Sequence, residues 1–256
     1  MVSPAAASRP DAQLRESNRR FYDPFWSAAE LVAPERFNTW PLVASLARPG
    51  QARLEVGPGL RPRLPLAGTA FADPSTPAVR KLRARGALAV AAEISALPFP
   101  DRSFELVAAL DVVEHVDDED RALHELARVT AAGATLLVSV PLHPERWTRF
   151  DELVGHRRRY EPERVRTQLA RHGFAIEASA SYGMQPACPR LVAFGLWALE
   201  HRPRRAHWLY ANVILPLGLR LQKELELSDG MIATERVDEI FLLCLRQPGG
   251  GAQRHG

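Results

Sequence analysis

The chain has 256 residues, of which 46% are apolar and 25% are charged, and its formal net charge is +3. This balance excludes a disordered polyelectrolyte and is typical of a globular protein. No apolar run approaches the roughly 18 residues of a membrane-spanning helix, and residues 1–13 lack an apolar core of signal-peptide length. We therefore expect a cytoplasmic protein. The widely separated Cys188 and Cys244 predict neither a disulfide framework nor a metal motif.

Strand and helix patterns alternate through the first half of the chain. Short apolar runs predict strands at 52–56, 69–72, 87–92 and 104–110. After the second strand, Thr76 is a suitable helix N-cap, Pro77 fits the first turn and Gly86 fits the C-terminus. The sequence therefore predicts a helix at 76–86 with both ends marked.

The same alternation continues through the second half. We expect helices at 117–133, 162–173 and 186–227, and strands at 134–140, 174–180 and 237–246. Strands that alternate with helices imply an α/β fold with a doubly wound, mostly parallel, Rossmann-like sheet covered on both faces.

The predicted organisation has three parts. Residues 1–46 are expected to form an N-terminal helical lid. Residues 47–246 form the sheet domain, with a helical insertion at about 183–229, and the glycine-rich residues 247–256 form a disordered tail.

Acidic residues follow the predicted strands at their carboxyl ends, where open parallel sheets bind their ligands. Glu55, Asp73, Glu93 and Asp111 each end a strand, and Glu114 comes just behind the last of them. Four carboxylates on one edge would repel a phosphate, so this edge favours a cationic, ribose-bearing cofactor.

A glycine turn follows the first strand. Gly57 and Gly59 form a G-x-G pair, but a dinucleotide-binding fingerprint would need a third glycine where Pro62 stands. A G-x-G pair alone also fits a simple tight turn. With Asp73 placed to accept both ribose hydroxyls, the pair favours a nucleoside-bearing cofactor other than a dinucleotide.

Successive motifs of the chain resemble those of the class I S-adenosylmethionine-dependent methyltransferases of the broad small-molecule type. These motifs are LEVGPG, FADPS, EISALPFPDRSFELVAALDVVEHV, ELARVTAAGATLLVSVP and VGHRRRYEPERVRTQLARHGF, which together cover about 54–174. The resemblance implies a seven-stranded sheet whose last strand is antiparallel, which matches the strand at 237–246. It also implies S-adenosylmethionine as the cofactor.

The resemblance assigns site residues along the strand ends. It implies that Glu55, Gly57 and Gly59 form the turn under the methionine part of the cofactor and that Asp73 binds the ribose. It also implies that Glu93 and Ile94 lie at the adenine, and that Asp111 and Val112 lie at the sulfonium. The acid beside the adenine is usually aspartate in the family.

The connection after the glycine turn departs from the family pattern. Thirteen residues separate Gly59 from Asp73, and Pro62 and Pro65 leave room for little more than a turn or two of helix. The segment at 18–26 is our candidate to complete the site, with Tyr22 as its cap. The same segment also fits an amphipathic helix that only packs on the sheet.

Methyl transfer from a sulfonium needs mainly positioning, so few catalytic groups are expected. For a hydroxyl acceptor a histidine base is favoured, and the candidates are His115, His143 and His156, each of which equally fits a structural role. The spacing of His143, Asp151, Glu152 and His156 matches no compact metal motif, so we expect no metal.

Two segments bear on the acceptor. Arg158, Arg159 and Tyr160 lie in a basic cluster that would bind a carboxylate or phosphate, or would form a solvated face. Aromatic residues interleaved with arginines would suit a small or lipid-like acceptor, or peripheral membrane contact through 190–226, and the same pattern also fits a helical cap packed on the domain. No array typical of a nucleic-acid reader is present, and no oligomeric state is indicated.

The sequence thus favours a methyltransferase acting on a small or lipid-like acceptor, most often at oxygen. Two alternatives stay open. One is a cofactor-binding relative without catalysis, and the other is an NAD(P)-dependent oxidoreductase, against which Pro62 and the acidic edge both argue.

Overall fold

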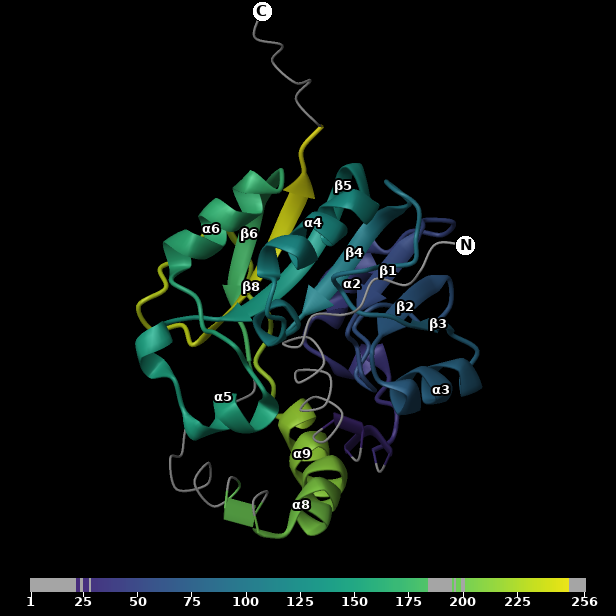
Figure 1. The fold of residues 1–256 in the computed structure, drawn as a ribbon, viewed down its shortest axis with the longest axis vertical. Coiled ribbons are helices and arrows are strands. Elements are labelled where there is room, and N and C mark those ends of the chain that lie inside the picture. Colours follow the sequence, from purple (N-terminus) through teal and green to yellow (C-terminus); the bar gives the residue numbers. More distant parts are fainter. Residues whose placement is uncertain are drawn as a thin grey trace, which may run out of the picture.

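The computed structural model of the protein describes residues 22, 23, 25–27, 29–183, 195, 197, 198 and 201–248. Their centre is an eight-stranded sheet with the order β3-β2-β1-β4-β5-β8-β6-β7 (Figure 1). The predicted doubly wound α/β fold is confirmed. The additional strand is β7, which has only two residues.

The elements occur in the following places. The strands are β1 (Arg53–Val56), β2 (Thr69–Asp73), β3 (Leu88–Ala91), β4 (Phe104–Leu110), β5 (Thr130–Pro141), β6 (Phe174–Ser181), β7 (Ser228–Asp229) and β8 (Glu239–Arg246). The α-helices are α2 (Trp40–Leu46), α3 (Thr76–Ala84), α4 (Glu119–Val129), α5 (Arg149–Val154), α6 (Pro162–Arg171), α8 (Pro203–Leu209) and α9 (Leu215–Arg220). Shorter turns are η1 (Pro34–Arg36), η2 (Val113–His115) and η3 (Pro144–Arg146), and η4 (Tyr210–Ile214) is a π-helix.

Strand direction divides the sheet into two parts. Strands β3, β2, β1, β4 and β5 are parallel, whereas β8 runs antiparallel between β5 and β6. In Figure 1 the β8 arrow points up, so the carboxyl ends of the parallel strands point down, toward α5, α8 and α9. No helix among the described residues is long and apolar enough to cross a membrane.

Alternate side chains of the strands pack into two hydrophobic cores, one on each face of the sheet. Leu54 and Val107 pack with α4 and α6 on one face. Leu106, Ala108 and Leu137 face the other way and pack against α2. Helix α3 covers the same face of the sheet at β2, where Phe71 packs against it. Phe71 pairs with Glu55 of β1, which pairs in turn with Ala108 of β4, so the side chains of Phe71 and Ala108 point to the same face.

The connection between β1 and β2 contains no helix at all, although a turn or two was expected. Leu60 and Leu64 instead lie in a turn and a bend, and both are fully shielded from solvent. The N-terminal segment covers this region: Phe25 and Trp26 pack with Leu60, and the Val32 N–H donates to the Leu60 carbonyl at 2.9 Å. An aromatic segment thus supplies the apolar cover that the connection lacks.

Several element boundaries differ from expectation. Helix α4 ends at Val129 and β5 begins at Thr130, so the small residues expected to end a helix belong to a strand. Their pairing with β4 is irregular between Phe104 and Leu106, which a local pattern does not reveal. In the predicted helix at 186–227, residues 221–227 are not helical, and residues 184–194, 196, 199 and 200 lie outside the described residues.

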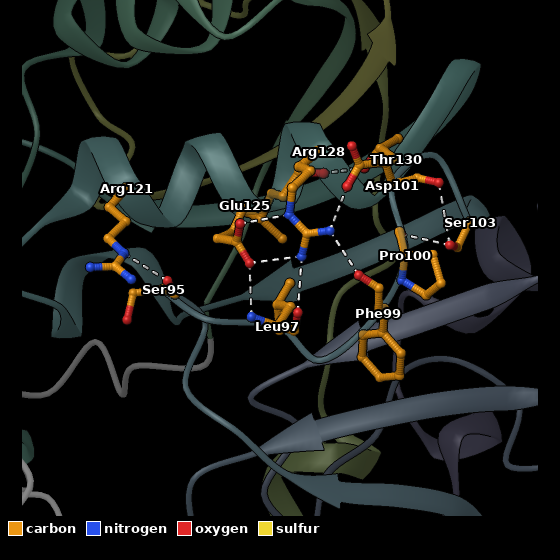
Figure 2. A network of polar contacts seen from close by, with 11 residues as sticks. Ser95, Leu97, Phe99, Pro100, Asp101, Ser103, Arg121, Glu125, Arg128 and Thr130 are labelled. Carbon is orange, nitrogen blue, oxygen red and sulfur yellow. Dashed lines mark hydrogen bonds and ion pairs between the residues drawn. The ribbon is translucent and has the colours of Figure 1, made fainter. Parts of the chain in front are cut away.

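One arginine ties the β3–β4 connection to α4. The Arg128 guanidinium makes five hydrogen bonds: two to the Glu125 carboxylate (2.7 and 2.9 Å), one to Asp101 (2.8 Å), and one each to the Phe99 (2.7 Å) and Leu97 (2.9 Å) carbonyls (Figure 2). Five is the full donor capacity of a guanidinium. The network holds the connection that follows β3, and with it the residues at that strand's carboxyl end.

We predict that Arg128→Lys destabilises the protein by about 2–3 kcal/mol, because an ammonium has three donors and leaves buried acceptors unpaired. The measurement is the free energy of unfolding in urea. The matched control is Arg166→Lys, where an exposed arginine pairs with Glu163 and the expected change is below about 0.5 kcal/mol. Equal losses in the two variants would contradict a clamping role for Arg128.

Candidate cofactor site and active-site edge

The turn after β1 requires its two glycines. Gly57 has a φ of +67°, and a Cβ atom there would lie 2.7 Å from the Val112 Cγ2 atom. Gly59 has a φ of +53°, and a Cβ atom there would lie 2.2 Å from the Trp26 ring. The turn is therefore a cradle of bare backbone enclosed between β4 and the N-terminal segment.

Glu55 binds the backbone of the chain that follows this turn. Its buried carboxylate accepts hydrogen bonds from the Arg63 N–H (2.9 Å) and the Leu64 N–H (2.8 Å). Burial raises the pKa of Glu55 to about 7, against the lowering effect of these bonds. The structure thus places Glu55 beneath the loop that the resemblance assigned to the cofactor.

Asp73 links the end of β2 to the glycine turn. Its Oδ2 atom accepts from the Gly59 N–H at 2.7 Å, and its Oδ1 atom accepts from the Ser75 N–H at 2.8 Å. Burial raises the pKa of this carboxyl to about 6. Each oxygen has a second lone pair that can accept from a hydroxyl, as ribose binding requires.

Asp111 occupies the end of β4 with a strained backbone, at a φ of +56°. Its N–H donates to Ser139 Oγ at 2.9 Å, and the Ser139 hydroxyl donates to Asp111 Oδ1 at 2.5 Å. The Asp111 side chain is exposed, so it is accessible to a ligand. A non-glycine residue at positive φ is uncommon and here sits at the expected functional edge.

Glu239 on β8 adds an acid that the sequence analysis missed. Burial and the nearby Asp111 charge raise its pKa well above the usual range, and the two carboxyl groups hydrogen-bond. No pattern in the last strand distinguishes this inward-facing acid from a surface one.

The residues that the resemblance assigns to the adenine follow the carboxyl end of β3. Ile94 is buried in the core, and Glu93 is half-buried beside it. Val112 is half-buried and packs against Gly57, so it lines the glycine turn.

Aromatic side chains of the N-terminal segment cover the turn. Tyr22 stacks on Trp26 with ring centroids 6.1 Å apart, and its edge meets His115 at 5.8 Å. The Arg61 guanidinium lies 5.4 Å from the Trp26 ring and 5.0 Å from the ring of Tyr210 in η4. Burial, followed by the Glu114 charge, raises the pKa of Tyr22. Tyr22 therefore lies between the glycine turn and the histidines.

Of the three candidate histidines, the structure brings His115 and His156 together, with ring centroids 4.7 Å apart. Burial and the neighbouring His156 lower the pKa of His115 to about 3, so it is neutral. His143 lies elsewhere: its Nε2 atom is 2.8 Å from the Thr234 carbonyl, and its Nδ1 atom is 3.5 Å from Glu145.

The predicted acceptor-binding arginines are engaged with the protein itself. Arg159 is 6% exposed and donates to Asp151 at 2.8 Å. Arg158 donates to the Val116 and Asp117 carbonyls and pairs with Glu119 at 2.9 Å, and Tyr160 is buried. In this arrangement these side chains anchor the 155–160 loop to η2 and α4.

Acidic groups therefore converge around a glycine turn at the carboxyl edge of the sheet. They are Glu55, Asp73, Asp111, Glu114 and Glu239. Fold and site together define a Rossmann-like domain built for a nucleoside-bearing, cationic ligand.

Comparisons with known proteins find similarity to methyltransferases in part of the chain. The methyltransferase-domain family model matches residues 55–138. A 58-residue segment is 45% identical to the ubiquinone/menaquinone biosynthesis C-methyltransferase of Hahella chejuensis, covering 22% of this chain and 23% of that protein. A 47-residue segment is 36% identical to the ajmaline N-methyltransferase of Rauvolfia serpentina, covering 18% of this chain and 16% of that protein.

The fold has close counterparts among solved structures. An S-adenosylmethionine-dependent methyltransferase of Thermotoga maritima, described as a possible histamine N-methyltransferase, matches with a TM-score of 0.56 and 15% identity. The match covers 93% of this chain and 95% of that one. Residues 55–138 therefore match a methyltransferase domain, and the fold is shared with an enzyme whose cofactor is S-adenosylmethionine. The glycine cradle and the doubly anchored Asp73 carboxylate fit that cofactor.

We predict a pH-dependent stability difference between the wild type and Glu55→Gln. The Glu55 pKa is about 7 in the folded protein and 4.5 in the unfolded chain, so between these values the folded state binds more protons. Stability contributed by protonated Glu55 is therefore present at low pH and is lost as pH rises. Wild-type unfolding free energy, relative to Glu55→Gln, should fall by up to about 3 kcal/mol from pH 4.5 to 7.5.

Chemical denaturation of the two proteins across this range, without cofactor, measures the difference. Glu163→Gln is the control, because Glu163 is exposed and its substitution should give only a small, flat offset. A flat difference for Glu55→Gln as well would contradict the raised pKa.

We also predict that Gly59→Ala destabilises more than Gly133→Ala. Both glycines have positive φ, which costs about 1–2 kcal/mol for alanine, but only Gly59 has a neighbour within 4 Å of the added Cβ atom. The clash with Trp26 should add about 1–3 kcal/mol in urea unfolding. The double variant Gly59→Ala, Trp26→Ala tests the cause, since removing the ring should abolish the penalty specific to the clash. Equal losses in the two glycine variants would rule out close packing at Gly59.

Proposed function

We propose that the protein transfers the methyl group of S-adenosylmethionine to a small or lipid-like acceptor, at an oxygen atom. The observation that carries this proposal is the set of acids around the glycine turn, among them Asp73 and Asp111. Such an edge attracts a sulfonium cation and repels the phosphates of a dinucleotide. Pro62, at the place of the third fingerprint glycine, also argues against an NAD(P)-dependent reaction.

In this proposal each part of the edge has a role in binding the cofactor. Gly57 and Gly59 admit the methionine part, and Asp73 accepts the ribose hydroxyls. Glu93 and Ile94 flank the adenine. Asp111 and Val112 lie at the sulfonium, and Tyr22 covers the site, as its contacts with Trp26 and His115 support. The cofactor supplies an activated methyl group, while the protein positions the acceptor and excludes water.

A cavity of about 280 Å³ supports a small, largely apolar acceptor. It lies between the N-terminal segment and helices η4 and α9, with Phe25, Trp26 and Leu215 in its wall and Arg36 and Arg61 at its polar part. This volume is close to the lower end of small-molecule sites. The shared Trp26 places the cavity next to the glycine turn.

Exposed apolar residues support a lipid-like acceptor or contact with a membrane surface through the predicted 190–226 region. Within the described part of that region, large apolar side chains are exposed along consecutive turns of α8, η4 and α9. They are Trp208 (62%), Val213 (46%), Ile214 (45%) and Leu217 (54%). Leu217 is three residues from Ile214 and four from Val213, so these three side chains share one side of the helix.

Oxygen is the proposed acceptor atom for an electrostatic reason. An acidic edge stabilises the protonated form of an amine, which has no lone pair with which to attack, whereas a hydroxyl is neutral and keeps its lone pairs. The matched relatives are named as C- and N-methyltransferases, so the assay must compare all three atoms.

Calorimetric titration with S-adenosylhomocysteine, followed by methyl-transfer assays on hydroxyl, amine and activated-carbon acceptors, tests the proposal. Wild type should bind with micromolar affinity, Asp73→Asn at least about tenfold more weakly, and NADH not at all. Asp229→Asn, at the exposed strand β7, is the matched acidic control and should bind as wild type does.

The outcomes separate the alternatives. Failure to bind S-adenosylhomocysteine would overturn the proposal as a whole. Binding without transfer to any acceptor would favour the cofactor-binding relative without catalysis. Transfer to amines alone would overturn the assignment of oxygen.

A further inference from the structure

Three potential metal ligands meet just beyond the carboxyl end of β4. Glu114 and His115 lie in η2, and His156 follows α5. One ligand atom of each residue lies within 4.8 Å of the other two. The His156 Nε2 atom is 3.9 Å from Glu114 Oε1, and the two imidazole centroids are 4.7 Å apart.

Two of these groups carry unsatisfied polar atoms among the residues that the structure describes. Glu114 is 1% exposed, and its buried Oε2 atom has no hydrogen bond; the buried Nδ1 atom of His115 also has none. The 3.9 Å between His156 Nε2 and Glu114 Oε1 is too long for a hydrogen bond. Buried polar atoms are almost always paired, so atoms left unpaired in one cluster point to a shared ligand.

Both imidazoles are already held on another side. His156 Nδ1 is 2.9 Å from Asp151, and that carboxylate also accepts from Thr148 and Arg159. His115 hydrogen-bonds to the Gly155 backbone. An imidazole that donates one ring N–H to a carboxylate or carbonyl presents its other nitrogen unprotonated, which is the form that binds metals.

We propose that Glu114, His115 and His156 bind one divalent transition-metal ion of the Zn²⁺ class, with Asp151 as the carboxylate that orients His156. Two imidazoles and one carboxylate suit Zn²⁺ better than Mg²⁺, which prefers oxygen ligands throughout. Ligand atoms on one tetrahedral Zn²⁺ lie about 3.3 Å apart, so the three side chains close on the ion by roughly an ångström.

This site replaces the sequence-based expectation of no metal. That expectation weighed the spacing of residues 143–156 alone, whereas Glu114 and His115 reach His156 only through the fold. Three protein ligands leave one coordination position open, as in catalytic zinc sites. An oxygen ligand, either water or a hydroxyl group whose pKa the ion would lower, would complete the coordination.

Zn²⁺ titration of the chelator-treated full chain tests the site, with no cofactor or acceptor present, so the result is independent of the proposed function. We expect one ion per wild-type chain, measured by calorimetry and by metal content after gel filtration. His115→Ala and His156→Ala should each weaken binding at least about 100-fold, and Asp151→Asn about 10–100-fold.

His172→Ala is the matched control and should leave the affinity unchanged, because His172 also pairs with an aspartate, Asp120 at 3.0 Å, but lies outside the cluster. Substoichiometric Zn²⁺ in the wild type would overturn the proposal, as would equal affinity in the wild type and the double histidine variant. If the histidine variants unfold, the test is the visible absorption spectrum of bound Co²⁺, compared between the wild type and Glu114→Gln. A shifted or lost spectrum supports the site, and an unchanged spectrum overturns it.

Discussion

Carboxyl groups buried at one edge of the sheet impose the constraint on which the site depends. A carboxylate without donors is costly inside a protein, so each buried acid fixes the backbone that satisfies it. Glu55 fixes the N–H groups of Arg63 and Leu64, and Asp73 fixes those of Gly59 and Ser75. The conformation of the glycine turn is thus a consequence of two acids as much as of its glycines.

The missing helix between β1 and β2 changes which part of the chain completes the site. A crossover between parallel strands usually contains an α-helix that covers the sheet. Here Leu60 and Leu64 are buried in turns of the connection, and the aromatic segment around Trp26 packs on Leu60. Because the same indole contacts Gly59 and borders the cavity, the N-terminal segment joins the glycine turn and the cavity into one surface.

Local patterns predicted most of the fold, because strands such as Phe104–Leu110 are buried on both faces and read as continuous apolar runs. The strand-end acids followed from the rule that parallel sheets bind at their carboxyl edge. The site contacts that the sequence analysis missed depend on packing between residues that are far apart in the sequence. Glu239 reaches Asp111 only because β8 inserts beside β5, and His156 reaches His115 only because α5 turns its following loop back to η2. The bonds from Arg128 to two carbonyls have no sequence signature.

The position of β8 also determines the order in which the sheet can be finished. Strands β5 and β6 are joined in the sheet only through β8, which pairs Thr135 with Leu245 and Phe174 with Arg246. Until residues 239–246 have left the ribosome, β5 presents an unpaired edge and β6 can pair only with the two residues of β7. Such long-range pairing slows folding and exposes edges to aggregation. The nascent chain therefore has a vulnerable stage that the parallel half of the sheet, complete by Pro141, does not share.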